Sequence, residues 1–243
     1  MEYFKWLVIF LFGSSILLFI PMLFIAVTTE SLEEGLVKIR NNPWALAAFS
    51  DFTVGFIFNL TLICVREGSD LYQVPGRRPS YWSAFFWVMF ALLVGNPAVL
   101  SYGIYQLIKA PNIKDAFLVT IGFDKTPSHT TTTKWLYWLF QLGMGGLLIY
   151  YVVSCLIALS SQSITSGWEY IQSDPWAYLT FFDNLLGILF TSVYMAVSQH
   201  PKWIHVIGWW LSLWLLGNGV TAIFAFQLCW RKYSIGESLV YRE

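Results

Sequence analysis

Six long apolar stretches alternate with short polar connections along this chain of 243 residues. Each stretch is long enough to cross the roughly 30 Å hydrocarbon core of a bilayer as an α-helix that rises about 1.5 Å per residue. Helices are favoured there because an unpaired backbone group in lipid is costly. The pattern predicts six transmembrane helices, near residues 4–27, 43–65, 81–107, 134–159, 175–197 and 203–230.

Two of these stretches carry the same motif. Aligned without a gap, PWALAAFSDFTVGFIFNLTLICV (43–65) and PWAYLTFFDNLLGILFTSVYMAV (175–197) are identical at eight of 23 positions. A proline in the first turn after Asn or Asp is typical of a helix start. The shared residues indicate an internal duplication, and they include the helix-start pairs and one acid in each copy: Pro43, Trp44 and Asp51, then Pro175, Trp176 and Asp183.

The duplication extends into the third and sixth stretches, where a Trp precedes Gly95-Asn96 and Gly217-Asn218 by eight residues. We therefore expect an all-α, polytopic membrane protein of two three-helix repeats. Because three crossings are odd, the second repeat is expected to be inverted relative to the first. The predicted division is a first repeat at 1–110, a linker at 111–133, a second repeat at 134–230 and a polar tail at 231–243.

Composition supports a multi-pass integral membrane protein. Hydrophobic residues make up 57% of the chain and charged residues 12%, against about a quarter charged in soluble domains. Lys plus Arg equals Asp plus Glu at 14 each, so no nucleic-acid partner is expected; the expected partners are membrane lipids, with other membrane proteins or a second copy as candidates. With six crossings the basic residues divide seven against seven, so the positive-inside rule assigns neither orientation nor membrane.

Buried polar residues are the main functional candidates. Asp51 follows Pro43 by eight residues, which places it roughly 12 Å into the membrane. Asn96 is expected roughly 8 Å from the same face. We therefore predict that Asp51 pairs with Asn96, and that Asp183 pairs with Asn218 in the opposite leaflet.

Three roles for these acids stay open: hydrogen bonds that hold helices together, a relay for a proton or cation, or a ligand or catalytic contact. The three histidines, at positions 129, 200 and 205, have no metal-ligand spacing, so no metal site is predicted. No cofactor-binding motif and no familiar catalytic motif is present, and the chain is more typical of a protein that is not an enzyme.

The pattern PWA....F.D...G, followed by an aromatic-rich helix, resembles a family of uncharacterised small integral membrane proteins of plants and bacteria. The resemblance covers both copies, through Pro43, Trp44 and Asp51 and through Pro175, Trp176 and Asp183. It implies a membrane protein of unidentified biochemistry and supplies no mechanism.

Three functional interpretations follow. The leading one is a scaffold, assembly or lipid-binding membrane subunit with intramembrane Asp/Asn pairs. The alternative is a small proton- or cation-coupled carrier that uses Asp51 and Asp183, although acids in opposite leaflets argue against it, because carriers usually place their site at the midplane. The third is a membrane enzyme that modifies a lipid or an isoprenoid.

Overall fold

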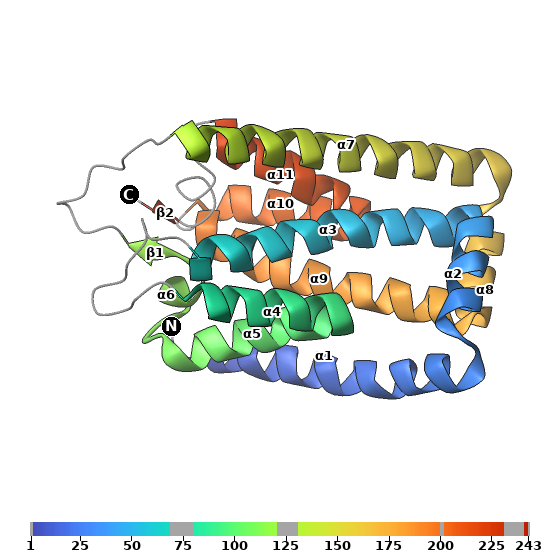
Figure 1. The fold of residues 1–243 in the computed structure, drawn as a ribbon, viewed down its shortest axis with the longest axis horizontal. Coiled ribbons are helices and arrows are strands. Elements are labelled where there is room, and N and C mark those ends of the chain that lie inside the picture. Colours follow the sequence, from blue (N-terminus) through green and yellow to red (C-terminus); the bar gives the residue numbers. More distant parts are fainter. Residues whose placement is uncertain (1, 69–79, 121–130, 200–201, 231–240, 243) are drawn as a thin grey trace.

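The computed structural model describes residues 2–68, 80–120, 131–199, 202–230 and 241–242. These residues are almost entirely helical (Figure 1). The elements are α1 (Glu2–Thr29), α2 (Leu32–Asn41), α3 (Pro43–Gly68), α4 (Tyr81–Val94), α5 (Asn96–Lys109), α6 (Ile113–Phe117), β1 (Val119–Thr120), α7 (Thr131–Ser161), α8 (Ile164–Ser173), α9 (Pro175–Gln199), α10 (Trp203–Leu216), α11 (Gly219–Trp230) and β2 (Tyr241–Arg242).

The same order of helices occurs twice. A long helix, a ten-residue helix, a second long helix and two short helices make up residues 2–109, here called the first unit. The same order makes up residues 131–230, the second unit. Between them lie α6 and the two-residue strand β1, which pairs in parallel with β2. The segment predicted as a linker thus contains a short helix.

Four helices are long and apolar enough to cross a membrane: Glu2–Thr29, Pro43–Glu67, Trp135–Ser161 and Pro175–Gln199. The third and sixth predicted spans are not among these four, because each of them is divided into two short helices. At about 1.5 Å per residue, a helix of 14 residues reaches about 21 Å, short of the hydrocarbon thickness. The described part of the chain is therefore all-α with four candidate spans.

Glycines divide the two remaining apolar stretches. Gly95 and Gly217 have φ of +82° and +70°, in the region that residues with a side chain rarely adopt. At each glycine the chain turns back. The ring of Trp87 on α4 lies 5.3 Å from that of Tyr102 on α5, and Trp209 on α10 lies 5.1 Å from Phe224 on α11.

Glu67 shows that the α4–α5 hairpin enters and leaves at one end of the molecule. This residue, near the end of α3, accepts hydrogen bonds from Ser83 at the start of α4 (2.8 Å) and from Gln106 near the end of α5 (2.6 Å). The start of α1 lies at that end too, because Lys5 donates to the carbonyl of Ala110 (2.7 Å). The α10–α11 hairpin ends beside the start of α7, where Tyr137 donates to the carbonyl of Cys229 (2.9 Å). Each hairpin therefore returns to the side from which it came (Figure 1).

Because each unit has two long helices and one returning hairpin, the second unit starts at the same end as the first. Helices α1 and α7 run in the same direction, α3 and α9 run in the opposite direction, and α2 and α8 lie together at one end (Figure 1). The prediction of inverted halves does not match this arrangement; it assumed that the third apolar stretch crosses completely.

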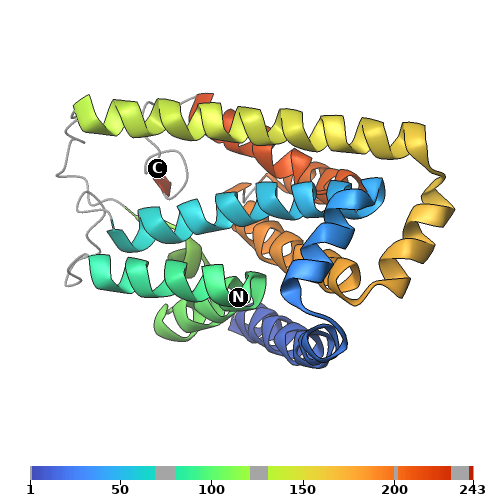
Figure 2. The same ribbon diagram turned by 45° about the vertical axis from the view of Figure 1, so that its right-hand side comes forward.

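Helices α3 and α9 form the centre, with α1 and α7 on opposite sides of them (Figure 2). Of their most apolar 18 residues, 56% and 67% are buried, against 17% in both α1 and α7. Asn59 on α3 and Thr191 on α9, at equivalent positions of the two units, hydrogen-bond across the centre (3.0 Å). The polar candidates on α3 and α9 consequently lie where the two units meet.

Candidate functional site

Each buried aspartate lies against the hairpin of the other unit. Asp51 on α3 and Asp183 on α9 each follow the proline that begins the helix by eight residues. They are 7% and 8% exposed. Because both helices begin at the same end of the molecule, both carboxylates lie at a similar depth, roughly 12 Å from that end.

At the Asp51 junction, the carboxylate receives hydrogen bonds from two elements of the second unit. The backbone N–H of Asn218 donates to Oδ1 (2.5 Å) and the carboxamide of Asn184 donates to Oδ2 (2.6 Å). The carboxamides are themselves connected, since Asn218 donates to Asn184 (2.7 Å) and Thr221 donates to Asn218 (2.9 Å). The result is a closed network of four polar side chains.

At the Asp183 junction, the polar contacts are fewer. The backbone N–H of Asn96 donates to Asp183 Oδ1 (2.9 Å), and the carboxamide of Asn96 donates to the backbone carbonyl of Asp183 (3.0 Å). The carboxamide oxygen of Asn96 is buried and has no hydrogen-bond partner among the described residues.

The predicted pairs were therefore wrong in their partners. Asp51 meets Asn218, not Asn96, and Asp183 meets Asn96, not Asn218. The physical reason is the returning hairpin, because its tip stops within the molecule and reaches across to the helix of the other unit. The four predicted residues do come together, but as two junctions between units rather than as one pair within each unit.

Glycines make these contacts possible. A Cβ built on Gly95 would overlap the carboxylate of Asp183, and one on Gly217 would overlap that of Asp51. The glycine of the repeated motif has a similar role, because Asn218 packs against Gly55 and Asn96 packs against Gly187. Asp and Gly four residues apart lie on one helix face. In the D...G spacing the Asp therefore accepts a hydrogen bond from the hairpin tip of the other unit, and the Gly leaves room for the Asn side chain of that tip.

The junctions satisfy a need of the hairpins themselves. Helices α5 and α11 begin inside the molecule, where the first N–H groups of a helix have no intrahelical acceptor. A carboxylate at a helix N-terminus accepts such a bond and interacts favourably with the helix dipole. Asp183 and Asp51 thus act as N-cap groups that one unit supplies to the other.

The tryptophans of the motif also contact the other unit. The indole N–H of Trp44 donates to the carbonyl of Gln162, and that of Trp176 to the carbonyl of Glu30, both at 3.3 Å. Their rings occupy the space that a side chain at Gly167 or Gly35 would need. The helix starts follow the prediction: Asn42 Oδ1 accepts from the N–H groups of Trp44 and Ala45, and Asp174 Oδ1 from that of Ala177.

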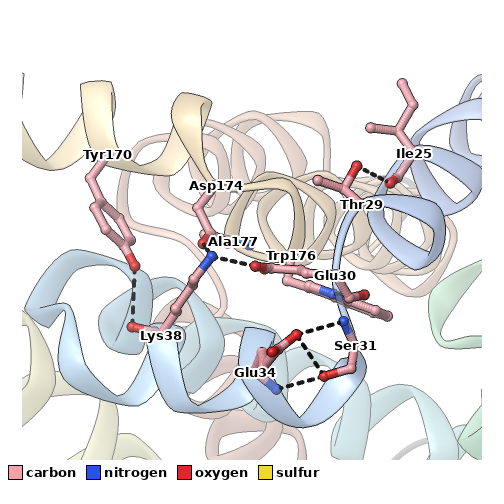
Figure 3. Close-up of polar contacts among 10 residues, drawn as sticks. All are labelled: Ile25, Thr29, Glu30, Ser31, Glu34, Lys38, Tyr170, Asp174, Trp176 and Ala177. Carbon is pink, nitrogen blue, oxygen red and sulfur yellow. Dashed lines mark hydrogen bonds and ion pairs between the residues drawn. The ribbon is translucent and has the colours of Figure 1, made fainter.

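Charges gather at the end that holds α2 and α8 (Figure 3). Lys38 on α2 forms an ion pair with Glu30 and lies 3.8 Å from Asp174. The hydrogen bond to Glu30 raises the pKa of the Lys38 ammonium. Tyr170, at the position of α8 equivalent to Lys38, donates to the backbone carbonyl of Lys38 (3.3 Å). At this end the first unit contributes a charged side chain, Lys38, to the contact between units, and the second unit contributes a neutral one, Tyr170.

Sequence reasoning missed Asn184 and Thr221. Asn184 directly follows Asp183 within an apolar stretch, and Thr221 lies three residues after Asn218. A buried carboxamide next to a buried acid is a usable signal, because a polar group in such a position needs a partner. Their first-unit counterparts, Phe52 and Val99, are apolar, so a search for residues common to both copies passed over them.

Comparison with known proteins leaves the family undecided. No protein-family model, no curated protein and no solved structure matches the chain. The resemblance to the uncharacterised membrane-protein family stays a prediction, and the function rests on the chemistry of the junctions.

Proposed function

We propose that this protein is a small membrane carrier for a proton or another small cation. In this proposal it consists of two repeats in the same orientation. Each repeat supplies two spanning helices and one re-entrant hairpin. The observation that carries the proposal is the reciprocal contact between the tip of each hairpin and a buried carboxylate of the other unit.

Interrupted helices that end near the midplane, at the interface between repeats, are typical of carrier binding sites. Non-helical backbone at membrane depth is tolerated where protein buries it or water lines it, and intramembrane acids are functional candidates. Helices α3 and α9 start at the same end of the molecule (Figure 1), so Asp51 and Asp183, each eight residues from the helix start, have a similar depth. They therefore do not lie in opposite leaflets, which would have disfavoured a carrier.

The same arrangement supports an orientation. Among the described residues, Lys5, Arg66, Lys109, Lys114 and Lys202 belong to the end where the hairpins enter, whereas Lys38 and Arg40 belong to the end with α2 and α8. By the positive-inside rule, the hairpin end faces the cytoplasm. Labelling of single cysteines in intact cells tests this: a cysteine at position 33 should react from outside, and one at position 112 only after permeabilisation. The reverse pattern would refute the orientation.

Transport is tested with purified protein in liposomes. A pH gradient, then a sodium and a potassium gradient, is imposed, and the flux is followed with ion-sensitive dyes trapped inside. We expect protein-dependent flux of one of these ions, which the double substitution Asp51→Asn and Asp183→Asn abolishes. Asp174→Asn is the matched control, because Asp174 starts a helix at a position where the first unit has Asn42.

A scaffold or lipid-binding subunit is the second candidate. The observation in its favour is the Asp51 network, in which all four polar side chains have partners. Protein that is folded but gives no flux of any tested ion would support this function over the carrier. Native mass spectrometry after gentle extraction would then identify bound lipid, partner subunits or a second copy.

A further inference from the structure

The two junctions share their backbone contacts but not their side-chain support. Asn184, which donates to Asp51, is replaced by Phe52 at the equivalent position of the first unit. Thr221, which donates to Asn218, is replaced by Val99. The two polar side chains that complete the hydrogen-bond network around Asp51 are therefore replaced by apolar side chains at the Asp183 junction.

The consequence is a buried group with no partner. Asn96 is 1% exposed, and its carboxamide oxygen has no hydrogen-bond partner among the described residues. This oxygen lies against Gly187, one helical turn along α9 from Asp183. An unpaired buried carbonyl and a buried carboxylate with few donors both raise the free energy of the closed junction.

We propose that the Asp183 junction is the one that opens. In this proposal the tip of the α4–α5 hairpin withdraws with Asn96, Asp183 becomes the binding site for one small cation, and the Asp51 junction stays closed. The proposal rests on the proposed carrier function and adds to it which carboxylate takes the ion and which hairpin moves.

The ligand is a cation because of what the withdrawn tip leaves behind. Asp183 would lose the N–H of Asn96, and a carboxylate in apolar surroundings stays charged only beside a counter-charge and is otherwise protonated. Asp51, at similar depth on α3, is held in its own junction. The charged side chains and histidine on the described elements packed against α9, apart from Asp51, lie near the ends of the longer helices or on the short helices α2, α6 and α8: Glu2, Lys5, Glu33, Glu34, Lys38, Arg40, Arg66, Glu67, Lys109, Lys114, Asp115, Glu169 and His205. The counter-charge must therefore be a mobile one, either a proton or a sodium-sized ion.

Hydrogen–deuterium exchange of the purified full chain tests the difference directly. We compare peptides that cover residues 95–99 and 217–221, each corrected for its intrinsic exchange rate. The Asp51 junction has at least one more hydrogen bond to break than the Asp183 junction, so its free energy of local opening should be higher. We therefore expect about tenfold faster exchange at 95–99 than at 217–221. Equal rates, or faster exchange at 217–221, would overturn the proposal.

Exchanging the side chains between the junctions provides matched variants. Phe52→Asn with Val99→Thr introduces the missing polar groups and should slow exchange at 95–99. Asn184→Phe with Thr221→Val removes them from the other junction and should raise exchange at 217–221 towards the wild-type rate at 95–99. If neither pair alters its own junction while the protein stays folded, the polar side chains do not control opening and the proposal fails.

The cation is identified in the same assay. Exchange at 95–99 is measured in sodium chloride against choline chloride, and over a pH series after correction for intrinsic rates. Sensitivity to sodium assigns an alkali-metal site, sensitivity to pH alone assigns a proton, and Asp183→Asn should remove either. Insensitivity to both would refute the cation site. A clear asymmetry of exchange in protein without ion flux would instead reject the carrier function while leaving the unequal junctions in place.

Discussion

The junctions at Asp51 and Asp183 begin from one motif and end with different chemistry. In both, a carboxylate accepts a backbone N–H at the start of a helix that begins inside the molecule, and a glycine at the tip leaves room for it. Around Asp51, however, Asn184 and Thr221 complete a closed network. The contact that involves the backbone is the same in both units, and the side chains around it differ.

The ends of α2 and α8 show the same division between common backbone contacts and different side chains. Both short helices begin with a serine whose hydroxyl accepts a backbone N–H, at Ser31 and at Ser163. Both face a tryptophan of the other unit across a glycine. Only α2 adds Glu34, which completes a capping box, and Lys38, which pairs with Glu30. At this end too, the units share their backbone contacts and differ in the side chains around them.

The largest expected effects come from substitutions that remove the shared contact. Gly95→Ala and Gly217→Ala each place a side chain at a positive φ and against a carboxylate. Strain at a positive φ and overpacking each cost about 1–3 kcal/mol, so we expect a combined loss of stability of about 3 kcal/mol or more, measured as a lower midpoint of thermal unfolding in detergent. Gly143→Ala is the control, because a Cβ there meets nothing within 4 Å. An unchanged midpoint in either tip variant would contradict the geometry of that junction.

Smaller, unequal effects are expected when the acids become amides. Asp51 accepts donors on both oxygens, so Asp51→Asn sets an NH2 group against another donor, and the loss should be about 1.5–3 kcal/mol. Asp183 Oδ1 accepts from the N–H of Asn96, and an amide can keep that bond through its oxygen. We therefore expect Asp183→Asn to destabilise less, by about 1 kcal/mol or below. Equal losses in thermal unfolding would remove the distinction between the junctions.

Much of the interface was predictable from the sequence because it depends on rare residue types. Proline after Asn or Asp predicted the starts of α3 and α9, and identity between the copies singled out Asp51, Asp183, Asn96 and Asn218. Hydropathy measures only whether a stretch is apolar over enough residues to span. It registers 81–107 as one span although Gly95 turns the chain within it.

That one error explains the others. Once the third stretch returns, each unit has two candidate spans instead of three. The units then run in the same direction, and the partners of the acids exchange. The dipeptide Gly95-Asn96 followed by Pro97 was the available signal, since Gly permits positive φ and Pro favours the first turn of a new helix. The second unit has no proline after Asn218, and this asymmetry weakened the signal.

The smallest expected effect concerns the first turn of α2. The backbone and hydroxyl of Ser31 hydrogen-bond to the carboxylate of Glu34 (3.1 and 2.9 Å), and these bonds lower its pKa from the ordinary 4.5. A lowered pKa means that the bonds stabilise the cap above about pH 4.5 and are lost as pH falls through the folded pKa. After correction for intrinsic rates, hydrogen exchange at 32–36 should therefore rise on acidification.

The equivalent turn of α8 provides the internal control for this prediction. Ser166 occupies the position of Glu34 there, so exchange at 164–168 should change little over the same pH range. Glu34→Gln should make the first turn of α2 equally insensitive, because a carboxamide can accept from Ser31 without titrating. If both turns respond alike in the wild-type chain, the response belongs to the whole molecule. The carboxylate of Glu34 would then not be what distinguishes the two ends.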